Sequence, residues 1–180
     1  MKELIGDEAM VKELFCSASK VVHTDLVLPN DTNNHNTLFG GVLMKKMDAV
    51  AAIASRRHSR REVVTASTDS VDFLGPVYPD DSLCLEAYVS YTGRTSMEVF
   101  VKAIAEDLGT GFRRIAATAF LTFVALDENG VPCSVPAVIP QTEEEKKLHE
   151  TGEDRAKIRK MRRINSKELA DFIKVDKPWT

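Results

Sequence analysis

Alternating apolar and polar side chains mark five segments of the chain as extended. Between Ser82 and Tyr91, and again between Ser96 and Glu106, every second side chain is apolar. Because successive side chains of a strand point to opposite faces of a sheet, this alternation predicts strands with one face toward a core. The predicted strands are Ser19–Leu28, Val63–Leu74, Ser82–Tyr91, Ser96–Glu106 and Ile115–Leu126, and the last is apolar on both faces.

A long helix is predicted between the first two strands, over Gly41–His58. Its apolar residues occupy almost every direction of the helical wheel, which is typical of a helix surrounded by other structure. Basic residues at its end suit the negative end of the helix dipole. A short helix is also predicted near Glu8–Phe15. We therefore expect an α+β protein in which an antiparallel sheet of about five strands wraps one long central helix.

Short, turn-rich links join the last four predicted strands. They lie at Gly75–Asp81, Thr92–Arg94 and Leu108–Gly111, and they contain the Gly, Pro and Asp residues that favour tight turns. Links of this length predict that the strands they join are antiparallel neighbours.

The chain changes character after Gly130. Prolines follow at every fourth position from 132 to 140, and Gln141–Arg163 is then charged and helical in pattern. We divide the chain into an N-terminal segment (1–14), a main domain (15–130), and an arm with a charged C-terminal helix (131–180). Two explanations of the charged side chains on this helix are open. They form a solvated face, or the basic ones contact an anionic ligand. The basic residues open to the second role are Arg155, Lys157, Arg159 and Lys160.

Composition narrows the function classes. A hydrophobic content of 43% over 180 residues supports a full core, and a net charge of −3 gives no reason to expect nucleic-acid binding. The three cysteines are far apart and lack metal-site spacing, as expected of reduced thiols in a cytoplasmic protein. No apolar run is long enough to span a membrane, so we expect no membrane partner.

The stretch Asn33–Asp48 holds the most informative polar chemistry. A polar loop leads into Gly40-Gly41 and the long helix, whose first N–H groups lack partners and suit an oxygen that becomes an oxyanion. Asp48 lies about 10 Å along the helix axis from Gly41. A tight turn and a solvated acid are the alternative explanations. If the site is real, the substrate lies along the helix or a second subunit completes the site.

Several motifs together resemble the hotdog-fold acyl-CoA thioesterases of bacterial cytosol and of mammalian brain and mitochondria. The resemblance covers about residues 15–160, in order and with similar spacing. The matching segments are Asn36–Met44, Met47–Asp48, Arg57–His58, Val63–Ser67, Asp72–Phe73, Pro76–Val77, Gly93–Val99, Leu121–Ala125, Val135–Pro136 and Thr142–Glu143.

The resemblance implies that the protein hydrolyses acyl-CoA to a free fatty acid and CoA. Asp48 matches the family's catalytic acid, which would act as a general base or a nucleophile, and the N–H groups at Gly40-Gly41 would bind the oxyanion. A second polar group would come from the partner's loop before the glycines. We assign it to Asn36, with Asn33, Asn34 and Thr37 left open.

The CoA contacts of the family map onto two strand segments and the charged helix. These residues are Ala66, Ser67, Thr68, Thr95, Ser96, Met97 and Lys157, and Arg94 would add positive charge beside them. For Thr95 and Ser96, a role in a hairpin turn is the alternative. CoA would be part of the substrate, and we expect neither a metal nor any other cofactor.

The resemblance also implies assembly. Two hotdogs would pair along their sheets, with active sites at the dimer interface, and three such dimers would form a homohexamer. The alternative function is a non-catalytic regulator that binds acyl-CoA or CoA on the same fold. The acid at position 48 favours the enzyme, because a binding module does not need a half-buried carboxylate.

Overall fold

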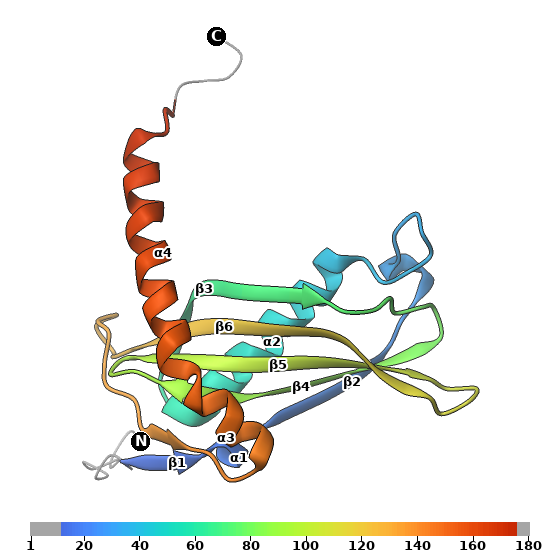
Figure 1. Cartoon of the computed structure of the whole chain (residues 1–180), viewed down its shortest axis with the longest axis horizontal. Coiled ribbons are helices and arrows are strands. Elements are labelled where there is room, and N and C mark those ends of the chain that lie inside the picture. The colour runs from blue at the N-terminus through green and yellow to red at the C-terminus, as the bar shows by residue number, and fades with distance from the viewer. Residues whose placement is uncertain (1–11, 176–180) are drawn as a thin grey trace, which may run out of the picture.

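The computed structural model describes residues 12–175 and contains a five-stranded antiparallel sheet curled around a long helix (Figure 1). The order of strands across the sheet is β2-β4-β5-β6-β3. Their bounds are Val21–Leu26 (β2), Glu62–Phe73 (β3), Asp81–Thr92 (β4), Ser96–Asp107 (β5) and Arg113–Leu126 (β6). This arrangement is the hotdog architecture, and it confirms the predicted α+β fold.

The central helix α2 spans Gly40–Ser59, as the apolar pattern predicted within one residue at each end. Its side chains Leu43, Met47 and Val50 are buried against the concave face of the sheet. Apolar side chains on that face, such as Leu85 and Val99, are fully buried. Most of the core therefore lies between α2 and the sheet, and burying these groups provides the main stabilisation.

One predicted strand pairing is wrong. β3 is not the neighbour of β4 but forms the edge of the sheet beside β6. The link after Phe73 crosses the end of β6, where the N–H groups of Leu74 and Gly75 bond to the carbonyl of Ala116. Seven residues can span three strand spacings of about 4.8 Å each, so a short link did not require adjacency. The other two links do join neighbours.

The N-terminal helix predicted near Glu8–Phe15 is also corrected. Residues up to 11 lie outside the described part, and Glu13–Phe15 form a short strand, β1. β1 pairs in parallel with β7 (Ala137–Ile139), which belongs to the proline-containing arm. Helix α1 (Cys16–Ser19) and a 3-10 turn (Pro29–Asp31) complete this half of the molecule.

The charged C-terminal region forms two helices instead of one. Helix α3 (Glu143–Glu150) begins with a capping box between Thr142 and Glu145, and helix α4 spans Gly152–Phe172. α4 crosses the convex face of the sheet and then projects beyond it (Figure 1). Between residues 12 and 175, no helix has the length and apolar character needed to cross a membrane.

Candidate active site

The start of α2 presents free amide groups. Phe39 precedes the helix in an extended conformation, and no hydrogen bond from the N–H groups of Gly40 or Gly41 to another described residue is found. A Cβ at position 41 would lie 2.6 Å from the ring of Phe39, and one at position 40 would lie 3.3 Å from the ring of Phe73. The glycines therefore let two aromatic rings close around a helix terminus that can receive an anionic oxygen.

Asp48 faces the edge strand from the third turn of α2. The hydroxyl of Thr65 on β3 donates a hydrogen bond to Asp48 Oδ1 at 3.1 Å. Asp48 is partly exposed, and no cation of the described residues pairs with it. The carboxylate is thus held by one neutral donor, with acceptor capacity left for a water or a substrate group. Sequence reasoning singled out Asp48 but did not identify Thr65 as its partner.

The loop before the glycines places the candidates for the second polar group in different surroundings. Asn33 accepts hydrogen bonds from the N–H groups of His35 and Thr37, and its own amide donates to the Thr37 hydroxyl. Asn33 and Thr37 line a cleft with Gly40 and Phe73. Asn36, our assignment from the sequence, is instead exposed at the tip of the turn with φ of 55°.

A second cleft lies between the middle of α4 and the sheet. Four of the residues assigned to CoA binding line it together, and the structure brings them beside three arginines of α4. Ala66 belongs to a β-bulge, where the register of β3 against β6 shifts between Thr65 and Ser67. The four assigned residues are Ala66, Ser67, Thr95 and Ser96, and the arginines are Arg159, Arg162 and Arg163.

Four other assigned residues lie outside this cleft. Met97 is fully buried in the core, so only its backbone is left for the predicted contact with CoA. Thr68 is exposed on β3, and Arg94 is exposed in the hairpin turn, where its carbonyl accepts the N–H of Val135. Lys157 lies on another side of α4 and pairs with acids of its own helix.

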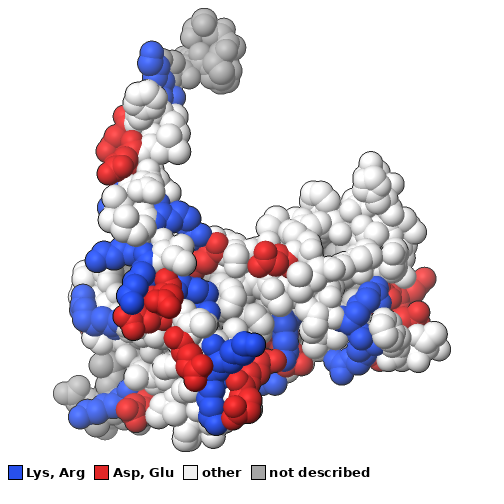
Figure 2. All heavy atoms as spheres, viewed as in Figure 1, with Lys and Arg blue, Asp and Glu red and all other residues white. Residues whose placement is uncertain are grey.

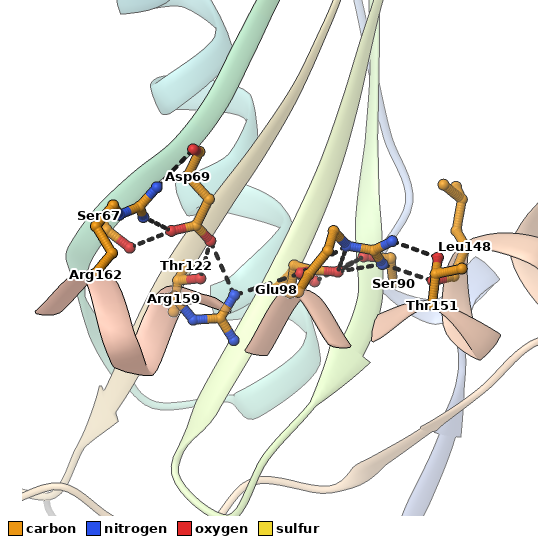
Figure 3. Close-up of polar contacts among 10 residues, drawn as sticks. Ser67, Asp69, Ser90, Glu98, Thr122, Leu148, Thr151, Arg159 and Arg162 are labelled. Atoms are coloured by element: carbon orange, nitrogen blue, oxygen red, sulfur yellow. Dashed lines mark hydrogen bonds and ion pairs between the residues drawn. The ribbon is translucent and has the colours of Figure 1, made fainter. Parts of the chain in front are cut away.

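Sequence reasoning missed the acid at the centre of the polar network, Asp69. Figure 3 shows it between α4 and the sheet, where Arg159 pairs with it at 2.9 Å and Arg162 bonds to both its carboxylate and its carbonyl. Burial opposes ionisation of Asp69, but hydrogen bonds from Ser67 and Thr122 and the charge of Arg159 outweigh it. The pKa of this carboxyl is therefore held below its usual value.

A second acid, Glu98 on β5, fastens the start of α4. Its side chain has no exposed surface and accepts a hydrogen bond from Arg155 at 2.7 Å. Ser90 donates to the same carboxylate at 3.0 Å, and Arg159 approaches it at 3.4 Å. A buried acid on an alternating strand, followed by arginines at helical spacing, was the only sequence signal for this network.

The two chemical elements of the site are far apart within one chain. Gly41 and Asp48 are separated by about 10 Å along the axis of α2. Asn33 belongs to the glycine end, whereas Thr65 belongs to the Asp48 end. In the described part of the chain, no group of three His, Cys, Asp or Glu side chains could hold a metal ion.

Comparisons with known proteins show which family the chain belongs to. The family model of the thioesterase superfamily matches residues 35–112 of this chain. A Bacillus subtilis protein named as an uncharacterised acyl-CoA thioester hydrolase is 60% identical over 165 residues, which cover 92% of this chain and 96% of the relative.

Solved structures show the same fold. The Staphylococcus aureus acyl-CoA hydrolase, solved in complex with butyryl-CoA and CoA, is 45% identical with a TM-score of 0.86, and the match covers 89% of this chain and 98% of that one. Variants of that enzyme with an aspartate, a threonine or an asparagine replaced by alanine were also solved. An apo-hexameric acyl-CoA thioesterase is 47% identical, with a TM-score of 0.82 and coverage of 84% and 97%. This chain therefore belongs to the thioesterase superfamily, among the hotdog-fold acyl-CoA thioester hydrolases.

Proposed function

We propose that this protein hydrolyses acyl-CoA at a site built from two copies of the chain. One copy supplies Asp48 and Thr65. The other supplies Asn33 and the free N–H groups at Gly40-Gly41. The observation that carries this proposal is the hydrogen bond from Thr65 to Asp48 at the unpaired edge of the sheet, about 10 Å from the helix terminus of the same chain.

The edge strand β3 supports the pairing of copies. It is twelve residues long, and several of its side chains are exposed, including Val64 and Phe73. A long, exposed edge strand is a template for pairing with another chain. Antiparallel pairing of two β3 strands would form one continuous sheet and bring each Asp48 toward the partner's loop. The hexameric relative supports further assembly, which we propose to be a trimer of dimers.

The proposed chemistry needs few groups. Asp48 acts as general base on a water, or attacks the thioester carbonyl itself. The N–H groups at the start of the partner's α2 stabilise the negative charge that develops on the carbonyl oxygen. Thiolate is a good leaving group, so this pair of elements suffices without a metal or other cofactor.

We assign the second polar group to Asn33 in place of Asn36. The asparagine at 33 lines the cleft beside Gly40, whereas Asn36 lies at an exposed tip. The variants of the Staphylococcus aureus enzyme support this choice. The three replaced residues of that enzyme have the same residue types as Asp48, Thr65 and Asn33. Adding one constant to their positions gives the numbers 48, 65 and 33 in this sequence.

The cleft under α4 is the proposed binding site for the CoA part of the substrate. It meets the same stretch of β3 that carries Thr65, and it offers the hydroxyls of Ser67, Thr95 and Ser96. These hydroxyls can bond to the amides of pantetheine. We further propose a cytoplasmic location, where acyl-CoA is available and the three thiols stay reduced.

Complementation between variants tests the two-copy site. Asp48→Asn and Asn33→Ala should each lower hydrolysis by about 100-fold or more. Co-expressed at equal levels, the two variants form mixed dimers in which one of the two sites is intact. Random pairing then restores about one quarter of wild-type activity.

A matched mixture provides the control. Asp48→Asn and Thr65→Val affect the same half of the site, so no mixed dimer contains an intact site, and activity should stay low. If the Asp48→Asn and Asn33→Ala mixture also stayed inactive, although mixed dimers were shown by mass spectrometry, the two-copy site would be refuted. A folded wild-type protein that binds CoA but releases no thiol from acyl-CoA would instead be a binding protein.

A further inference from the structure

An apolar stripe runs along the outer side of α4. Four of its side chains are between 57% and 84% exposed, namely Ile158, Met161, Leu169 and Phe172. At about 3.6 residues per turn, all four lie within about 40° of Asn165 on the helical wheel. Asn165 shares one open groove with Ile158, Met161 and Leu169. We call these five residues the outer stripe.

The outer stripe does not face the sheet. Arg155 and Arg159, which bond to acids of the sheet, lie about 80° and 120° from Asn165 on the same wheel. Docking of α4 on the sheet therefore leaves the stripe accessible. Figure 2 shows uncharged side chains over much of the part of α4 that projects beyond the sheet. Because most helices in proteins are stabilised by the packing of an apolar face, we expect a partner to cover this one.

The outer stripe is symmetric about Asn165. Ile158 and Phe172 lie seven positions before and after it, and Met161 and Leu169 lie four positions before and after it. A two-fold axis through Asn165 would place Ile158 opposite Phe172 of an antiparallel second helix, and Met161 opposite Leu169. An isologous contact requires a surface that is complementary to itself, and this spacing provides one.

The polar member of the stripe fits the same arrangement. Two Asn165 side chains would meet at the two-fold axis, where each amide can both donate a hydrogen bond to the other and accept one from it. A single asparagine among apolar residues is a known means of fixing the register of paired helices. The position of Asn165 therefore favours a second copy of the same helix over an unrelated apolar partner.

Charges beside the stripe favour the antiparallel direction. On one flank, Lys157 and Lys160 lie in the first half of the stripe, and Glu168 and Asp171 lie in the second half. Antiparallel helices place the basic half of one flank against the acidic half of the other, whereas parallel helices place like charges together. Lys157 is 65% exposed and pairs with Glu153 of its own helix, so an exchange of that partner costs little.

We propose that α4 pairs antiparallel with α4 of a second copy of this chain, about a two-fold axis at Asn165. This contact is separate from the proposed pairing of β3 strands, because the outer stripe lies on a side of α4 that does not face the sheet. One copy can therefore make both contacts, and α4 would link β3-paired dimers to one another. The inference goes beyond the proposed function, and its test does not depend on hydrolysis.

Cysteine cross-linking tests the pairing and its register. The axes of packed helices lie about 8–10 Å apart, which brings the two Cα atoms at position 165 within the disulfide range of about 4–7 Å. Under mild oxidation, Asn165→Cys should form covalent dimers from most of its chains. Met161→Cys alone should not, because its two copies would lie about 12 Å apart along the axis. Co-expressed Met161→Cys and Leu169→Cys should form the mixed covalent dimer, which mass spectrometry identifies.

Matched controls separate this contact from random collision. Lys160→Cys lies about 140° from Asn165 on the wheel and should not cross-link, and the wild type measures any contribution of its own three cysteines. Leu169→Lys, added to Asn165→Cys, should abolish the cross-link and leave hydrolysis per chain unchanged. If Asn165→Cys cross-linked no more than Lys160→Cys, or Met161→Cys alone as readily as its mixture with Leu169→Cys, the proposal would be overturned.

A lipid surface is the other occupant that an apolar stripe beside lysines fits. Sedimentation with vesicles of anionic phospholipid distinguishes the two occupants. Wild-type protein that stays in the supernatant, together with cross-linked Asn165→Cys, supports pairing of α4 helices. Wild-type protein that pellets with the vesicles, together with no cross-link at position 165, would assign the stripe to a membrane surface and overturn the proposal.

Discussion

Replacing Arg155 by methionine tests whether a buried ion pair holds α4 on the sheet. Arg155 donates to both oxygens of Glu98, a carboxylate with no exposed surface. Its guanidinium also lies 4.2 Å from the ring centre of Phe120. Methionine keeps apolar contact with that ring but leaves the carboxylate without its main partner.

The magnitude follows from the geometry. Removing one partner of a buried ion pair costs about 3–5 kcal/mol. Arg159 remains at 3.4 Å from Glu98, and Arg155 is itself 22% exposed, so partial compensation and entry of water are expected. We therefore expect the lower value, about 3 kcal/mol. For a chain of this size, that corresponds to a fall in Tm of about 6–12 °C.

Thermal unfolding of four proteins at one fixed concentration measures this effect, because the stability of an oligomer depends on concentration. They are the wild type, Arg155→Met, Glu98→Gln and the double variant. The double variant has no unpaired buried charge, so it should be more stable than Arg155→Met, with a coupling energy of about 2 kcal/mol. Lys160→Met is the control on the exposed side of the helix. Equal Tm values for Arg155→Met and Lys160→Met would refute the reasoning.

Two further predictions concern the start of α4 and the end of α2. A Cβ at Gly152 would lie 2.5 Å from the ring of Tyr91 and 2.7 Å from its Cβ. Gly152→Ala should therefore lower the free energy of unfolding by about 1–3 kcal/mol and lower Tm. Gly75→Ala is the control, because a Cβ at Gly75 meets no atom closer than 3.8 Å, and it should leave Tm unchanged. Burial lowers the pKa of His58 despite its 2.9 Å hydrogen bond to the carbonyl of Pro136. A lowered folded-state pKa means that the stabilisation is present above the unfolded value of about 6.5 and is lost as pH falls through the folded value. The Tm of the wild type should therefore fall between pH 7 and pH 5, and His58→Gln should show a smaller fall. A slope that is equal in both proteins would contradict this assignment.

Local patterns determined most of the fold. The period of two in β4 and β5 and the apolar wheel of α2 predicted these elements to within one or two residues. Gly40-Gly41 and Asp48 could be proposed as site residues from the sequence, because a helix start and a polar residue within an apolar helix are local features. The resemblance to a known family rested on several such short segments in a fixed order.

Only the tertiary structure decided which distant residues meet. The β3 edge lies beside β6 instead of β4, since a short link can cross the end of a strand. Our proposal of Asn33 in place of Asn36 rests on a turn with a left-handed residue at Asn36, which leaves Asn36 exposed while Asn33 lines a cleft.

The acids that hold α4 could not be paired from sequence. Asp69 and Arg159 are separated by 90 positions, and no local period relates a strand bulge to a helix that docks on it. Their contact arises because α4 crosses the convex face of the sheet at the bulge. The sequence by itself therefore determined most of the helices and strands, and it supplied the residue types of the candidate site. The tertiary structure decided which of the charges on α4 are neutralised by the sheet, because pairing depends on distance in space.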